Sequence, residues 1–227
     1  MSEQVHNEMM DRLTIREAVE NWVLWRDRGD WTRFRTIWHP DGKMTATWFQ
    51  GGFEQFMKRS QAGFDNGVRV LHALGGSAID VVGDRATAET KMTIHQRAAV
   101  EGVLCDVACM GRSYDLFERR GGKWGLVLRQ HVYDMDRLGP VDPGNRVVLD
   151  RSVLERFPDA YRHLAYVQQS QGLEIRRDLP CAGSVEAEAV LRSGTRWLSG
   201  GSTENSEVIA DATDERNPLS PAASSER

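Results

Sequence analysis

Four long stretches of alternating hydrophobicity, separated by very short turns, constrain this chain more than any other feature. They run over roughly residues 68–82, 85–99, 103–119 and 123–137. The connections are "GDR", "VEG" and "RRGGK", and turns this short join neighbouring antiparallel strands. The sequence therefore predicts a four-stranded antiparallel meander.

The region before this meander has helical spacing. Residues 11–28 place apolar side chains along one helix face and Gly29 ends that helix, while Asp30 begins a second short helix. A short strand, "KMTATWF", and a third helix, "GGFEQFMKRSQAGFDNG", follow. Helices followed by a meander predict an α+β fold in which a curved sheet wraps around the N-terminal helices as a cone. Polar residues on its concave face would line a buried pocket.

The rest of the chain divides into two parts. We assign residues 1–140 to the main domain and residues 141–198 to a helical C-terminal extension, with helical stretches at 150–171 and 184–198. Residues 199–227 carry six acidic and two basic groups and almost no large apolar side chains, which predicts a disordered acidic tail.

Composition excludes several functional classes. The tail accounts for the whole net charge of −4, so the folded part has no basic stripe for nucleic acid. A signal peptide and an apolar run of membrane length are both missing, which favours a cytoplasmic protein without a membrane partner. Three cysteines without CxxC spacing argue against a disulfide framework or a zinc site, and the sequence contains no phosphate loop or dinucleotide fingerprint. We therefore expect neither a metal nor a cofactor.

Several polar residues fall at positions where they would face the pocket. Each also has a simpler interpretation. His72 lies in an apolar run where a lone histidine is more often structural, and His95 reads as a surface residue on the polar side of its strand. In residues 123–137 the alternation places three polar side chains on one face of the strand, and such a series more often marks a solvent-exposed face than a site. The candidates are Asp27, His72, His95, Arg129, His131 and Tyr133.

Four motifs, taken in order, give these residues a context. They are "DRGDWTRF" with Asp27, "LHALGG" with His72, "TIHQR" with His95, and "ERRGGKWGL". This pattern resembles scytalone dehydratase and its relatives in the nuclear transport factor 2-like (SnoaL-like) superfamily, which includes hexachlorocyclohexane dehydrochlorinase. The resemblance runs from about residue 10 to residue 138.

The resemblance implies a cofactor-free acid–base site inside the cone. Asp27 would hold His72, and His72 would act as the general base that takes a proton from carbon while a leaving group departs from the neighbouring carbon. His95 would bind or protonate the leaving oxygen. A neutral imidazole suits this role because it titrates near working pH and a carboxylate partner stabilises the cation that forms.

Departures from the family pattern concern substrate recognition. The two tyrosines that hold a water in the dehydratase correspond to Arg26 and Ala46, and its pocket asparagine corresponds to Ser113 or a neighbour. The last strand, apolar in the dehydratase, is polar here. We therefore expect a different substrate, whose phenol or hydroxyl groups are read by Arg129 and Tyr133. The remaining predicted substrate-binding residues are His131, Ser113 and Phe49.

The extension contains "FPDAYRHLAYVQQSQGLEIRRDLPCAGS" and, after it, "EAVLRSGTRWLSG". These stretches resemble the C-terminal extension of bacterial SnoaL-like proteins from aromatic-degrading organisms, and the extension would cover the pocket mouth or pack against another subunit. This group includes sphingomonad diarylpropane lyases. We predict a cofactor-independent lyase acting on a small hydroxylated aromatic substrate, with a lignin-derived diarylpropane diol that loses water and formaldehyde as one named candidate. A non-catalytic ligand-binding or interaction module is the alternative. Isomerisation also stays open, whereas epoxide hydrolysis usually needs more acids around a water than this pocket provides. A homo-oligomer, either trimer or dimer, is expected.

Overall fold

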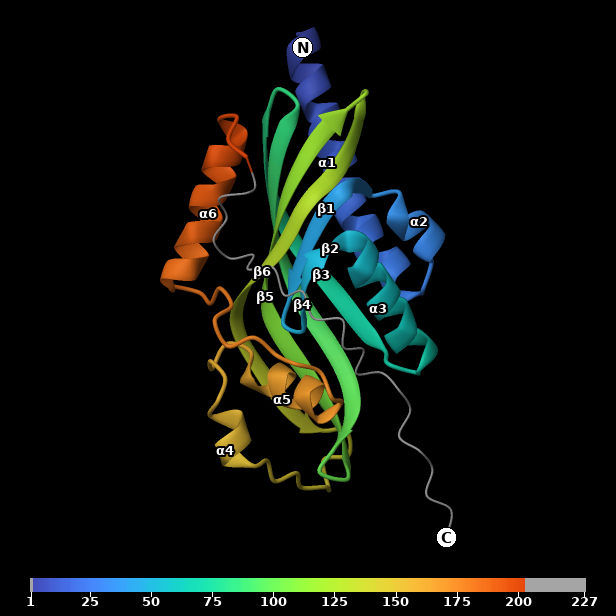
Figure 1. Cartoon of the computed structure of the whole chain (residues 1–227), viewed down its shortest axis with the longest axis vertical. Helices are drawn as coiled ribbons and strands as arrows, with labels where there is room; N and C mark the ends of the chain where they lie inside the picture. The colour runs from blue at the N-terminus through green and yellow to red at the C-terminus, as the bar shows by residue number, and fades with distance from the viewer. Residues whose placement is uncertain (1, 203–227) are drawn as a thin grey trace.

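The computed structural model describes residues 2–202, so the predicted tail lies, from residue 203 onward, outside the described residues. The described part is a mixed α+β structure with one long curved sheet and helices on both of its faces (Figure 1). The helices are α1 (Glu3–Asp27), α2 (Trp31–Arg35), α3 (Phe53–Asp65), α4 (Arg151–Leu154), α5 (Arg162–Ser170) and α6 (Val185–Leu198). The strands are β1 (Trp38–Ala46), β2 (Phe49–Gly52), β3 (Val70–Val82), β4 (Arg85–Val100), β5 (Val103–Arg120) and β6 (Lys123–Pro140).

The sheet has the order β2-β1-β6-β5-β4-β3. Strands β3 to β6 form the predicted antiparallel meander, and β1 joins it in parallel with β6. The stretch predicted as one short strand is instead two strands, because the chain turns at Thr47 and Trp48 and β2 folds back onto β1. Of the residues described, no helix is long and apolar enough to cross a membrane.

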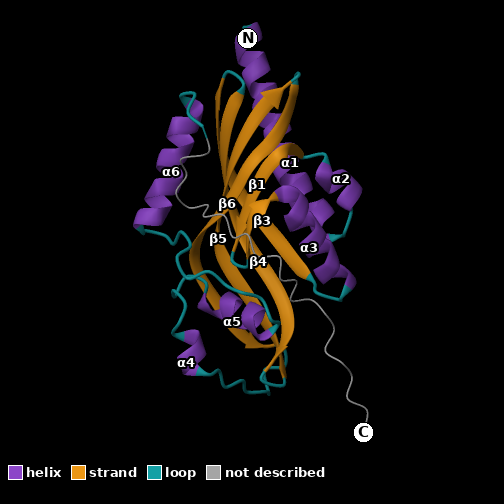
Figure 2. Cartoon of the chain, viewed as in Figure 1, coloured by secondary structure: helices purple, strands orange, loops and turns teal. Residues whose placement is uncertain are grey.

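Strand length explains why the fold needs two separate helical covers. Strands β5 and β6 each have 18 residues, which at about 3.3 Å per residue is far longer than the short helix α3. Helices α1 to α3 cover one part of the inner face through residues such as Trp22 and Phe34. Helix α5 covers the other part, where Leu164 packs with Val107 and Tyr133. Figure 2 shows these helices along different lengths of the same strands.

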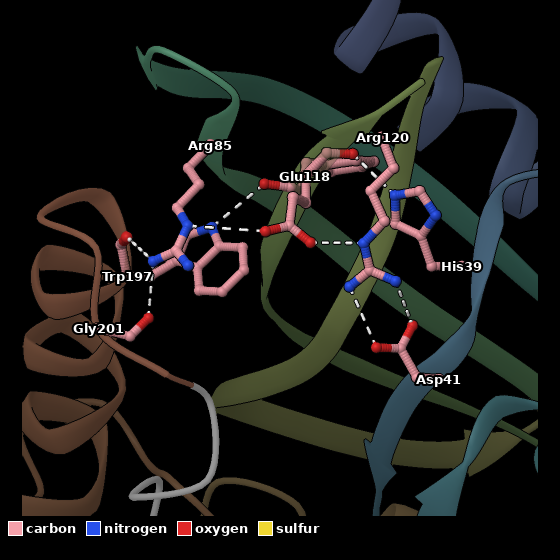
Figure 3. A network of polar contacts seen from close by, with 8 residues as sticks. His39, Asp41, Arg85, Glu118, Arg120, Trp197 and Gly201 are labelled. Carbon is pink, nitrogen blue, oxygen red and sulfur yellow. Dashed lines mark hydrogen bonds and ion pairs between the residues drawn. The ribbon is translucent and has the colours of Figure 1, made fainter. Parts of the chain in front are cut away.

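Helix α6 lies on the opposite, outer face of the sheet, where its residue Val190 packs with Tyr114. A polar network fixes its C-terminal end (Figure 3). The guanidinium of Arg85 lies 4.0 Å from the ring of Trp197 and donates to the Trp197 carbonyl at 3.0 Å. Glu118 then links Arg85 to Arg120, which pairs with Asp41 at 2.6 Å. The network therefore joins α6 to the β5–β6 turn and to β1.

A bulge in β3 preserves the inner face along the whole strand. Leu74 pairs with Met92 and Ser77 pairs with Thr90, so three steps along β3 match two along β4. The extra residue falls in the two glycines of "LGGS", as expected for a bulge. His72 and Leu74 therefore share the inner face with Ser77.

Candidate active site

Asp27 and His72 form a hydrogen-bonded pair between the end of α1 and the start of β3. Oδ1 of Asp27 lies 2.7 Å from Nδ1 of His72, and Oδ2 accepts the backbone N–H of His72, also at 2.7 Å. Both side chains are largely buried, with 12% and 6% exposed. An acid at a helix C-terminus opposes the helix dipole, and these two hydrogen bonds compensate for that penalty.

The surroundings keep His72 neutral and set its tautomer. Burial lowers the pKa of His72, Asp27 opposes this shift, and the charges of Arg26 and Arg129 add to it. The ring also makes an edge contact with Trp22 at 5.4 Å between centroids. Because Nδ1 faces a carboxylate, the proton lies on Nδ1, and Nε2 is left as the basic nitrogen.

Arg129 and Asp115 form a fully buried ion pair on the inner face of β6 and β5. Two parallel hydrogen bonds of 2.7 and 2.6 Å join the guanidinium to the carboxylate, and both side chains are 0% exposed. Nη1 of Arg129 has no partner among the described residues, and neither has Oγ of Ser113. The Arg129 guanidinium also lies 4.2 Å from the Trp22 ring. The NH₂ group at Nη1 of Arg129 and the Ser113 hydroxyl are thus left without a described protein partner on the inner face.

His131 and Tyr133 continue this inner face, as the alternation of β6 predicted. Ser113 pairs with His131 in the sheet register. Burial, with the charges of Arg129 and His72, lowers the pKa of His131 to about 3, so this ring is neutral. Tyr133 lies further along, 4.9 Å from the Tyr161 ring, and burial raises its pKa well above its usual value.

His95 does not lie on the inner face, and that expectation is wrong. In the register of β3 and β4, Ile94 pairs with His72, whereas His95 pairs with Leu71. Leu71 is 64% exposed and His95 is exposed as well. The inner face of β4 is the one with Met92, Ile94 and Gln96, because the sheet buries the apolar side of this alternation. His95 therefore cannot assist a leaving group at His72.

Phe49 belongs to the aromatic core and does not line the pocket. Its ring contacts Phe56 at 5.5 Å and Trp48 at 5.8 Å, and the Arg59 guanidinium lies 5.6 Å from its centroid. It supports Trp48, whose side chain does reach the pocket.

A pocket of about 80 Å³ opens where the two helical covers meet, which is room for several waters. Helices α1 and α3 and strands β3 and β4 form one wall, and the C-terminal extension supplies Gln168, Gln171 and Leu173. Nε2 of Gln96 donates to Oε1 of Gln171 at 2.9 Å across this boundary. The extension thus forms part of the pocket wall. That it covers the pocket mouth or packs against another subunit stays a prediction. The other lining residues are Arg26, Trp48, Arg59, Ser60, Gly63, Phe64, Val68 and Val70.

The pocket and the Asp27–His72 pair are adjacent but distinct. His72 does not line the pocket; Arg26, which does, directly precedes Asp27. Val70 and Gln96 form a pair in the sheet. This pair lies next to the pair of His72 and Ile94 on the inner face.

Sequence reasoning missed Asp115, Gln96 and Arg59, although the position of Asp115 two residues after Ser113 could have indicated a shared face.

Comparison with known proteins shows the family of the chain. Residues 7–130 match the model of the SnoaL-like domain. Pea pathogenicity protein 2 of Fusarium vanettenii is 34% identical to the chain, with 84% of the chain and 87% of that protein covered. An uncharacterized protein of Emericella nidulans is 32% identical, with 86% and 88% covered. These shares exceed the part matched by the domain model, so the relatives also share part of the C-terminal extension.

The fold itself is found in solved structures. A scytalone dehydratase candidate from Novosphingobium aromaticivorans superposes with a TM-score of 0.51 at 16% identity, covering 63% of this chain and 99% of that one. The part of this chain that remains uncovered is larger than the tail outside the described residues. The shared fold thus accounts for only part of the described residues.

Proposed function

Since this chain belongs to the SnoaL-like domain family, we propose that it is a cofactor-independent lyase that eliminates water from a small hydroxylated aromatic substrate. Asp27 orients His72, and His72 is the general base. The observation that supports this most is the double hydrogen bond from one carboxylate to the ring and backbone of His72, at 2.7 Å each.

The proposed reaction begins at Nε2 of His72, which removes a proton from a carbon next to the one that carries the hydroxyl. The electrons of the broken C–H bond form a C=C bond as the C–O bond breaks. The leaving hydroxide takes up the proton held by the imidazolium, so water is released and His72 returns to its neutral form. Asp27 stabilises the imidazolium while it exists.

Charge on the departing oxygen needs a donor other than His95. Nη1 of Arg129 and Oγ of Ser113 are buried on the inner face without partners among the described residues. Arg129 lies close enough to lower the pKa of His72 through its charge. We assign to these two groups the contact with the substrate hydroxyl, with the neutral His131 ring beside them.

A lignin-derived diarylpropane diol remains the first named substrate to test. With this substrate, loss of the phenol proton and of hydroxide would release water and leave a quinone methide. Deprotonation of the terminal hydroxyl would then break the C–C bond and release formaldehyde, and the electrons of that bond would form the conjugated C=C bond while the phenol oxygen takes up the proton. Three features of the pocket suit aromatic ligands: the rings of Trp48 and Phe64 and the apolar side chain of Leu173.

The test is a screen of hydroxylated aromatic monomers and dimers without added cofactor, following ultraviolet absorbance for new conjugation. We expect His72→Ala to abolish the signal while its circular dichroism matches wild type. A well-folded and fully active His72→Ala protein would refute the proposal. Substrates that bind but give no product in the wild type would instead favour the alternative, a non-catalytic ligand-binding module.

A further inference from the structure

The pocket contains two arginines, Arg26 and Arg59, and none of its described lining residues is acidic. Arg26 lies 3.7 Å from Asp27, the carboxylate that is already hydrogen-bonded to His72. Arg129 is neutralised by Asp115 in the same way. Arg59 contacts the Phe49 ring but forms no ion pair within residues 2–202. Of the three arginines in the pocket and on the inner face beside it, Arg59 alone carries a positive charge that no described carboxylate compensates.

Three residues that line this pocket each carry a buried polar atom without a partner in the described part of the chain. Nε of Arg26, Oγ of Ser60 and Oε1 of Gln96 are each buried without a hydrogen bond among the described residues. An unsatisfied buried polar group costs about 1–3 kcal/mol. Burial lowers the pKa of Arg26, and the negative charge of Asp27 offsets only part of this shift. Three such groups around one cavity indicate a ligand that can accept and donate hydrogen bonds there.

The apolar residues that line the pocket indicate that the rest of the ligand is apolar. Trp48 and Phe64 are aromatic, and Val68, Val70 and Leu173 are aliphatic. The enclosed space of about 80 Å³ is smaller than the cavity of about 150 Å³ that encloses benzene. A small head group therefore fits inside, and the aromatic side chains of the lining can contact the ring of the same ligand.

We infer that this pocket binds the carboxylate of an aromatic acid, held by Arg59 and Arg26, with the Ser60 hydroxyl as a further donor and Oε1 of Gln96 as an acceptor for a hydroxyl group of the same ligand. The site is distinct from the inner-face groups assigned to the departing hydroxyl. The inference deepens the proposed function, because it makes the lyase substrate a hydroxylated aromatic acid, but binding can be measured whether or not turnover occurs. Charge-assisted bonds of this type are about twice as strong as neutral ones.

The experiment compares cinnamate with its neutral analogue cinnamamide, by isothermal titration calorimetry on the full chain. We expect cinnamate to bind at least about tenfold more tightly, a difference of about 1.4 kcal/mol. The preference should shrink with added salt, because it depends on charge.

Arg59→Gln should reduce the preference to within about twofold, and Arg59→Lys should restore part of it. The matched control is Arg177→Gln, because the Arg177 guanidinium lies 5.9 Å from the Phe157 ring, much as Arg59 lies over Phe49, yet Arg177 does not line the pocket. This control should keep the wild-type preference. Circular dichroism of each variant establishes that it is folded.

Three results would overturn the inference: equal affinity for the two compounds, no measurable binding of cinnamate to the wild type, or a preference that survives both Arg59→Gln and Arg26→Gln. Failure of the proposed function looks different. A protein that binds cinnamate selectively but eliminates no substrate refutes the lyase and keeps the carboxylate site. A protein that eliminates water from its substrates but binds cinnamate and cinnamamide equally refutes the carboxylate site and keeps the lyase.

Discussion

One carboxylate, that of Asp27, holds both the ring and the backbone of His72, with each oxygen 2.7 Å from its donor nitrogen. In Asp27→Asn, the amide oxygen stays on the backbone N–H, so the NH₂ group faces Nδ1. Nδ1 must then accept, the proton moves to Nε2, and the base is lost. We expect kcat to fall by about 10²–10⁴-fold, the usual contribution of a general base. Steady-state kinetics on a substrate from the screen measures this.

His95→Ala is the matched histidine control for that variant, because His95 is exposed on the outer face. Its kcat and KM should equal those of wild type. A loss of activity comparable to that of Asp27→Asn would contradict the placement of the site on the inner face.

Stability should fall as the pH drops below 6.5, the ordinary pKa of histidine. His131 has a pKa of about 3 in the folded chain, so between these values the unfolded state binds the extra proton. The free energy of unfolding then decreases by about 1.4 kcal/mol per pH unit for this group. The lowered pKa of His72 acts in the same direction. Urea unfolding of wild type and His131→Gln between pH 7.5 and 5.5 tests this, and equal slopes would refute it.

Removing one member of the buried pair of Arg129 and Asp115 should lower the free energy of unfolding much more than replacing both members with apolar residues. Asp115→Leu leaves the Arg129 charge buried and unpaired, and we expect a loss of about 3–5 kcal/mol in unfolding free energy. The double variant Asp115→Leu, Arg129→Met removes both charges and should be more stable than the single variant. Urea titrations of all three proteins give the comparison. A double variant less stable than Asp115→Leu would contradict it.

Gly194 allows α6 to approach the sheet. A Cβ atom built there would lie 1.9 Å from Oη of Tyr114, so Gly194→Ala should destabilise the protein by about 1–3 kcal/mol. Tyr114→Phe removes that oxygen and should relieve part of the loss. Gly63→Ala is the helical control, since its nearest contact is Val68 Cβ at 3.9 Å. That change should stabilise α3 by up to about 1 kcal/mol, and equal losses at both glycines would contradict this view of the α6 interface.

The sheet could be predicted closely because its signal is local. Alternation and the three short turns define β3 to β6 without reference to the rest of the chain. Alternation does not, however, say which face points inward. On β6 both faces are buried, the one with Arg129 and His131 on the inside and the one with Leu128 and Val132 beneath α6. On β4 the apolar face is buried and the polar one, with His95, is exposed.

The order of motifs suggested the pairing of Asp27 with His72, and the fold class suggested a pocket, but neither suggested the residues that line the pocket. Its lining depends on contacts between Arg26, the inner strands and Gln171, which are distant in sequence and follow no periodic pattern. Asp115 was missed for the same reason, since its partner Arg129 becomes visible only once the register of β5 and β6 is known.

The pocket is lined by residues as far apart in sequence as Arg26 and Leu173. It therefore exists only in the folded protein, and the unfolded chain has no binding site for the ligand. A ligand that binds there stabilises only the native state, by about 2.7 kcal/mol at a concentration one hundred times its Kd. The melting temperature thus reports occupancy directly. Candidate substrates can be ranked by the shift that each produces, before any product has been identified.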